Sequence, residues 1–158
     1  YKKSAAEGNA EAGYRIGVLY ETGKGVSKNY GKAAEWYSSS AEMFNSTAMY
    51  RMGFLHEKGM GVPKSMQEAE KWYRRAADAG NSWSQFYFGE KCEHGKGVKK
   101  DLVFAHAWYN LASRGMGNKE LWKKAKSARD RVALKLTPEE LARAEKIVRD
   151  WRPQKYKK

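Results

Sequence analysis

The sequence predicts an all-α protein, a solenoid of helix-turn-helix repeats that ends in a C-terminal capping helical hairpin. Three observations lead to this fold class. A set of residue markers recurs every 36 residues, apolar residues have helical spacing on both sides of a recurring glycine turn, and the last segment keeps that spacing but lacks the turn. A single helical hairpin of this length cannot bury both of its faces, so consecutive hairpins must stack on one another.

Five markers define the repeat, and each occurs three times with a step of 36 residues. Two of them are short motifs, the Gly-x-Gly-Val turns at 23–26, 59–62 and 95–98 and the Trp-Tyr pairs at 36–37, 72–73 and 108–109. The other three are columns of single residues: a glycine column (Gly17, Gly53 and Gly89), an alanine column (Ala33, Ala69 and Ala105) and an asparagine column (Asn9, Asn45 and Asn81). Five markers in one register exclude chance as the explanation. We expect the tryptophan column to pack in the core between repeats.

Apolar residues in the first repeat step by three and four positions, which predicts one helix over about 10–21 and another over about 30–41. The Gly-Lys-Gly segment at 23–25 separates them, because glycine readily adopts the left-handed conformation that closes a helix. Gly17 lies in the middle of the first helix, where glycine costs about 1 kcal/mol relative to alanine. We therefore expect the antiparallel second helix to approach closely at Gly17 and its equivalents.

The closing segment predicts two further helices. Thr137, Pro138 and Glu140 supply a capping threonine, a proline at the first helical position and a glutamate three residues after the cap. The predicted organisation comprises repeats at 9–44, 45–80 and 81–116, capping helices at 117–152, a basic tail at 153–158 and the end of a truncated upstream repeat at 1–8. Tyr1 lies 36 residues before Tyr37, so we expect at least one more repeat upstream in the source protein, with room there for an export signal.

The chain has 158 residues and a net charge of +13, and the charge is unevenly distributed. Residues 119–158 hold 14 basic and 6 acidic side chains, whereas residues 1–118 hold 17 and 12. Such an excess favours anionic partners, either an acidic protein surface or, as weaker alternatives, an anionic membrane surface or nucleic acid. A solvated helical surface is the simpler explanation. The single cysteine, Cys92, excludes an intrachain disulfide, and no apolar run approaches the ~18 residues that span a bilayer.

The pattern Ala-x-x-x-(Ile/Met/Phe)-Gly-x-x-(Tyr/His/Cys)-x-x-Gly-x-Gly-Val, followed after six residues by Ala-x-x-Trp-Tyr, resembles the Sel-one-like repeat, a branch of the tetratricopeptide superfamily. The resemblance covers residues 1–112, and the segments 108–112 and 136–142 are similar to the closing region of many bacterial members. The sequence departs from the pattern at Phe44, where glycine is usual, and at His56 and Cys92 in the Tyr20 column.

This resemblance implies a right-handed α-α superhelical solenoid that binds other proteins, commonly as an adaptor. It implies a bacterial protein and favours a periplasmic or exported location, with a cytoplasmic one as the alternative. Some bacterial members neutralise secreted toxins or act as envelope scaffolds, and both roles remain alternatives for this chain.

No cluster of side chains predicts catalysis, so we expect neither an enzyme nor a small-molecule substrate. His56 and Cys92 share a repeat column, and His94 could be imagined beside them as a metal ligand. A structural zinc site needs four ligands with short-range pairing, which this sequence lacks. Core packing for the cysteine and a polar contact for the histidine explain these residues better, and we expect no metal and no cofactor.

Aromatic and apolar residues on the first helix of each repeat predict a partner-binding groove. Tyr14, Tyr50 and Phe86 lie two positions before the packing residues of the hairpin and so point away from its seam. By the tetratricopeptide resemblance this face lines the concave side. The predicted binding residues are Tyr14, Val18, Glu21, Tyr50, Phe54, Glu57, Trp83, Phe86, Tyr87, Glu90 and Glu93. An apolar strip rimmed by charge is typical of an interface core. The alternative is that these residues pack against the next repeat.

Overall fold

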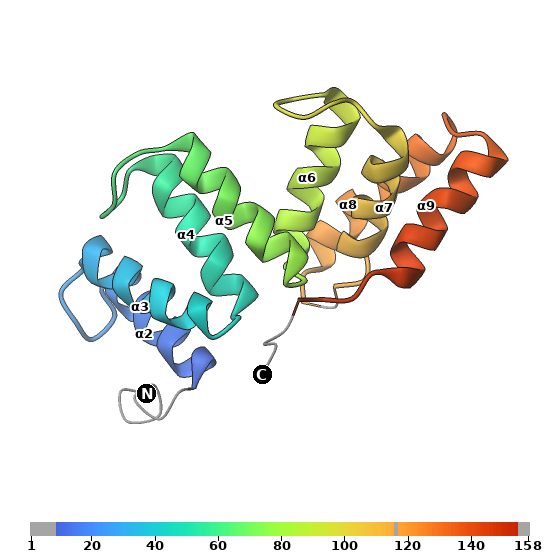
Figure 1. Cartoon of the computed structure of the whole chain (residues 1–158). Coiled ribbons are helices and arrows are strands. Elements are labelled where there is room, and N and C mark those ends of the chain that lie inside the picture. The colour runs from blue at the N-terminus through green and yellow to red at the C-terminus, as the bar shows by residue number, and fades with distance from the viewer. Residues whose placement is uncertain (1–8, 116, 155–158) are drawn as a thin grey trace. The chain divides into compact units, whose positions relative to one another are not determined.

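The structure, a computed structural model, describes residues 9–115 and 117–154, and this part of the chain is built from eight α-helices and no strands (Figure 1). The helices are α2 (Ala10–Thr22), α3 (Tyr30–Glu42), α4 (Ser46–Lys58), α5 (Met66–Asp78), α6 (Ser82–His94), α7 (Leu102–Ala112), α8 (Lys119–Ala133) and α9 (Pro138–Asp150). The two helices predicted for the first repeat are confirmed, each ending one residue later than expected. The predicted upstream remnant at 1–8 and the last four residues of the tail lie outside the described residues.

Each of these helices begins at a polar residue whose side chain accepts a hydrogen bond from the backbone N–H three residues later. The capping residues are Asn9, Asn29, Asn45, Ser65, Asn81, Asp101, Asn118 and Thr137. Such a bond satisfies one of the free N–H groups at a helix start and contributes about 1 kcal/mol. At Thr137 the backbone N–H also donates a hydrogen bond to the Glu140 carboxylate, which confirms the predicted capping box.

The glycine turns end the first helix of each repeat. Gly23, Gly59 and Gly95 have φ values of 75°, 70° and 69°, the left-handed conformation that favours glycine. The second glycine of the turn can serve a different purpose. A Cβ on Gly61 would lie 2.5 Å from the backbone nitrogen of Gly31 and would overlap the Tyr30 carbonyl group. The turn of the second repeat therefore packs directly on the start of α3.

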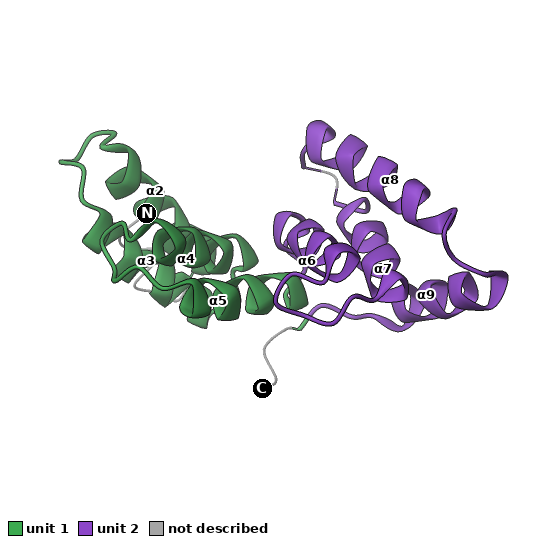
Figure 2. Ribbon diagram, turned by 90° about the horizontal axis from the view of Figure 1, so that it is seen from above, with its two compact units in different colours: residues 1–79, 154–158 green, residues 80–153 purple. Residues whose placement is uncertain are grey.

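The described helices fall into two compact units, which are coloured separately in Figure 2. The first unit contains α2 to α5, packed in sequence order, α2 on α3, α3 on α4 and α4 on α5. Its core consists of small and large apolar side chains from successive hairpins. The fully buried members include Ala33, Tyr37, Ala48 and Leu55. Alanine at these positions lets neighbouring helices approach closely, while the tyrosine fills the remaining volume.

The second unit contains α6 to α9, and α7 is its centre. α6 packs on α7, and the two closing helices each pack on α7 more extensively than on one another (Figures 1 and 2). Eight residues of α7 are buried as a result. Trp108 is among them, whereas Trp36 and Trp72 are only half-buried. Helix pairs that pack in sequence order and end in a closing pair make this an α-α solenoid.

Candidate partner-binding face

The mid-helix glycines leave space for tyrosine side chains of the facing helix. A Cβ on Gly53 or Gly89 would lie 2.5 Å from a ring carbon of Tyr73 or Tyr109. The equivalent pair in the first repeat is Gly17 and Tyr37. The expected close approach is therefore real, but the group nearest to each glycine is a buried tyrosine ring, and at Gly53 the backbone oxygen of Ala69 would also lie 3.1 Å from a Cβ. This ring supports the first helix of each repeat from inside.

Each of these tyrosines donates a hydrogen bond to a glutamate near the end of the first helix. Tyr73 donates to Glu57 and Tyr109 to Glu93, each at 2.8 Å, and Tyr37 donates to Glu21. The separation is 16 residues in all three cases. Burial and the neighbouring carboxylate raise the pKa of Tyr37 and of Tyr109, so both phenols stay protonated and remain donors.

Basic side chains from a neighbouring helix complete two of these arrangements. Arg51 of α4 lies 3.5 Å from Glu21. Arg131 of α8 lies 2.6 Å from Glu93, whose side chain is only 5% exposed. Burial by itself would raise the pKa of Glu93, but the hydrogen bonds from Arg131 and Tyr109 outweigh that effect and lower it. Glu93 is therefore an ionised carboxylate that ties α6 to α7 and α8.

Three of the predicted binding residues, Glu21, Glu57 and Glu93, thus already have intramolecular partners. From their positions in the sequence, these glutamates were predicted to form the charged rim of a groove. The structure instead gives them hydrogen bonds within their own hairpin. Their repeated spacing from the tyrosines was the signal in the sequence for this role. Arg131 has no repeat equivalent, and no sequence pattern marked it.

The aromatic column is supported by the same tyrosines and stays partly exposed. The same ring contact occurs once in each repeat. The centroid distances are 5.8 Å for Tyr14 and Tyr37, 5.6 Å for Tyr50 and Tyr73, and 5.4 Å for Phe86 and Tyr109. The three outer residues, Tyr14, Tyr50 and Phe86, are half-buried. They therefore have both a packing role and a remaining free surface.

The other predicted binding residues differ in how far they join the core. Val18 is half-buried and packs against the core cluster of the first unit. Phe54 is half-buried, with the Lys58 ammonium 5.8 Å from its ring centroid. In the second unit, Trp83 is 38% exposed and Glu90 is exposed. Tyr87 is half-buried and meets Phe88 edge-on at 5.5 Å. Each unit thus presents apolar surface on its first helices.

His56, Cys92 and His106 lie in separate environments and do not form a common site. His56 Nδ1 lies 3.1 Å from the Pro63 carbonyl oxygen of the same repeat. Cys92 is half-buried and packs against the core cluster that includes Tyr109. His106 is buried, and this burial together with nearby Arg129 lowers its pKa. Across residues 9–115 and 117–154, no group of three or more His, Cys, Asp and Glu side chains is placed to hold a metal ion.

None of the helices that the structure describes combines the length and the apolar character that a membrane crossing requires.

The model of the Sel1 repeat matches the chain at residues 10–43, 46–81 and 84–115. The chain belongs to the Sel1 repeat family. These three segments coincide with the hairpins α2–α3, α4–α5 and α6–α7. Sel1 repeat proteins are in general non-catalytic scaffolds for protein–protein interaction.

Two solved structures of Sel1-type proteins are similar to the chain. One is a Sel1 repeat protein from Oxalobacter formigenes, 38% identical, with a TM-score of 0.62 over 67% of this chain and 42% of that one. The other is a protective antigen of uropathogenic Escherichia coli strains that displays an SLR fold, 30% identical, with a TM-score of 0.56 over 96% of this chain and 39% of that one. The chain thus spans about two-fifths of the length of either. No curated protein matches it.

Proposed function

We propose that the first helices of the repeats bind a protein or a peptide segment, and that the chain acts as a non-enzymatic scaffold. One observation carries this proposal. Each first helix keeps an aromatic side chain partly exposed at the same repeat position, at Tyr14, Tyr50 and Phe86. Apolar surface held in place by a rigid interior is what an interface core requires, since little side-chain freedom is lost when a partner covers it.

Phe54 offers the sharpest test of this surface. It is half-buried and lies outside the core cluster against which Val18 and Tyr50 pack. Peptides that bind the chain would first be selected from a random display library. We expect Phe54→Ala to weaken the selected peptides by about tenfold, because aromatic anchors dominate interface energies, and to leave the unfolding midpoint nearly unchanged. Tyr50→Ala should weaken them too, with a loss of stability from the contact to Tyr73.

Gln67→Ala is the matched control, because Gln67 is exposed on α5, the other helix of the same repeat. Isothermal titration would give the affinities and thermal unfolding would check the fold. Peptides that bind Phe54→Ala and Gln67→Ala equally well, within twofold of the parent chain, would remove the first helices from the binding surface.

A further inference from the structure

The basic excess of the closing segment is concentrated on one helix. α8 carries six basic and two acidic residues, whereas α9 carries three basic and four acidic residues. The expected basic character of the closing hairpin is thus a property of α8. This difference identifies the part of the second unit that attracts anions.

Half of the basic side chains of α8 are already paired with carboxylates. Arg129 lies 2.6 Å from Asp130, Arg131 lies 2.6 Å from Glu93, and Lys124 lies 3.7 Å from Glu120. The other three are Lys119, Lys123 and Lys126. All three are exposed, and within the described part of the chain none of them forms a salt bridge.

The three unpaired lysines share one face of α8 with an exposed tryptophan. Lys119, Trp122, Lys123 and Lys126 are separated by three, one and three residues, so they form a single stripe, called here the α8 basic face. Trp122 is 41% exposed, and the Lys126 ammonium lies 5.1 Å from the centroid of its ring. The α8 basic face therefore combines positive charge with one exposed aromatic ring that can contact an apolar side chain of a ligand.

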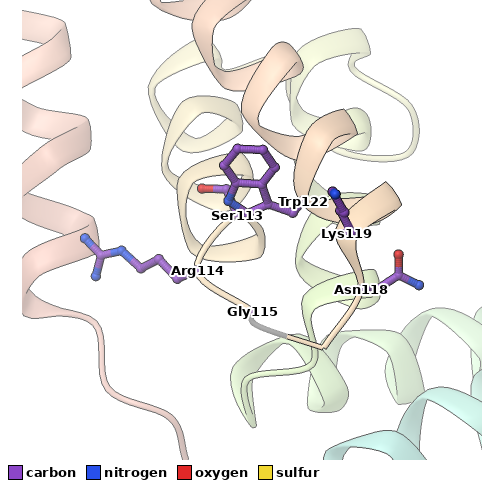
Figure 3. A pocket seen from close by; sticks show the side chains of 6 residues that line it. All are labelled: Ser113, Arg114, Gly115, Asn118, Lys119 and Trp122. Carbon is purple, nitrogen blue, oxygen red and sulfur yellow. The ribbon is translucent and has the colours of Figure 1, made fainter.

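A pocket adjoins the N-terminal end of this face, where α7 is joined to α8 (Figure 3). It has a volume of about 490 Å³ and is lined by Ser113, Arg114, Gly115, Asn118, Lys119 and Trp122. In the view of Figure 3, the Arg114 and Lys119 side chains lie on either side of Trp122. Gly115 is required here because a Cβ would collide with Ser82. Trp122 thus forms an aromatic wall of the pocket beside Lys119, whereas the Arg114 guanidinium extends away from the indole.

We propose that the α8 basic face and this pocket bind an acidic peptide segment of a partner protein, with an apolar side chain of that segment against Trp122. The length of the face fits such a ligand. Lys119 and Lys126 are seven residues apart, about 10 Å along a helix, and an extended peptide covers that distance in about three residues. Carboxylates at either end of such a stretch meet the lysines while the residue between them meets the indole.

The same observations disfavour two other anionic surfaces. A helix that lies on a membrane needs a continuous apolar face, whereas Trp122 is the one large apolar side chain exposed within α8. Single-stranded nucleic acid is held by a series of aromatic rings that stack successive bases, and this face has one ring in a pocket. A short peptide needs only that one apolar contact.

The probe is a fluorescein-labelled peptide, Glu-Glu-Phe-Glu-Glu, whose binding to the whole chain is followed by fluorescence anisotropy. We expect the double variant Lys119→Gln/Lys126→Gln to weaken binding about fivefold or more, as for the loss of two exposed ion pairs. Trp122→Ala should weaken it to a similar extent. The peptides Gln-Gln-Phe-Gln-Gln and Glu-Glu-Ser-Glu-Glu should both bind less tightly than the probe.

Arg143→Gln/Lys146→Gln is the matched control, since it removes two exposed charges from α9 instead. If this control weakens binding equally, the probe is held by the overall positive charge of the chain, and the proposal is overturned. If the probe does not bind the parent chain, the proposal is overturned as well. Tighter, Trp122-dependent binding of phosphatidylglycerol vesicles or of an oligothymidylate also overturns it. Phe54→Ala should leave probe binding unchanged, so this test is independent of the one for the first helices.

Discussion

Gly17 and Tyr37 occupy one shared volume between α2 and α3. A Cβ on Gly17 would overlap the tyrosine ring, whereas a Cβ on Gly13 would lie 3.4 Å from the Ser40 Cβ, an ordinary contact. We expect Gly17→Ala to lower the free energy of unfolding by roughly 1–2 kcal/mol, because overpacking exceeds the gain in helix propensity. Gly13→Ala should raise it by up to about 1 kcal/mol. Urea unfolding of both variants measures the difference, and changes of the same sign would contradict the assignment.

Glu93 makes stability depend on pH. Its pKa in the folded chain lies below the ordinary value of a glutamate carboxyl group, so folding favours the ionised form. The resulting stabilisation is complete above the unfolded-state pKa and disappears as the pH falls through the lower, folded-state pKa. We expect Glu93→Gln to be clearly less stable than the parent chain at pH 7, with a difference that shrinks below about pH 4.5. Urea unfolding at several pH values tests this, and a difference that is independent of pH would exclude the ion pair with Arg131 as its source.

At the residue scale, the sequence identified the repeat columns better than their partners. It predicted close packing at Gly53, but the buried ring of Tyr73 follows from three-dimensional contact alone. Glu57 was predicted to face a ligand, whereas its bond to Tyr73 requires both helices to be placed. The Asn45 column was recognised by its period, and the hydrogen bond that the Asn45 side chain accepts from the Ala48 backbone N–H explains it as a helix cap.

Gly61, the second glycine of the turn in the second repeat, contacts the hairpin before it. Gly61 and Gly25 have nearly the same φ, 71° and 74°, but only Gly61 touches another element, the start of α3 at Tyr30. Both alanine variants should lose about 1 kcal/mol from backbone strain. We expect Gly61→Ala to lose at least about 1 kcal/mol more, because α3 must shift. Thermal unfolding compares the two, and equal losses would show that this contact does not stabilise the stack.

At the element scale, helix positions were predictable because they depend on local signals. Apolar spacing, a cap such as Asn29 and a closing glycine such as Gly23 lie within one stretch of chain. The way in which α8 and α9 pack was not predictable. Each has one apolar stripe, and such stripes could pack against each other in a hairpin or could each pack against a third helix. Their packing on α7 depends on which surface of α7 remains open after α6 has covered one side.

At the scale of the whole chain, stability in a solenoid comes from contacts between neighbouring units. α7 shows this most clearly, because eight of its eleven residues are buried and three helices, α6, α8 and α9, pack against it. Val132 of α8 and Val148 of α9 are both almost fully buried. The closing helices therefore act as part of the core of the third repeat and not only as a polar end.

Removal of α8 and α9 should consequently also unfold part of the chain that remains. We expect a chain of residues 1–117 to lose helical signal at 222 nm beyond the share of the two missing helices, because exposed α7 cannot hold its packing on α6. It should also bind a hydrophobic dye. A chain of residues 1–152 keeps both helices and is the control. Circular dichroism and thermal melting measure the outcome. Equal melting temperatures for the two chains would mean that the third repeat is stable without the closing helices, and that α7 tolerates an uncovered apolar surface.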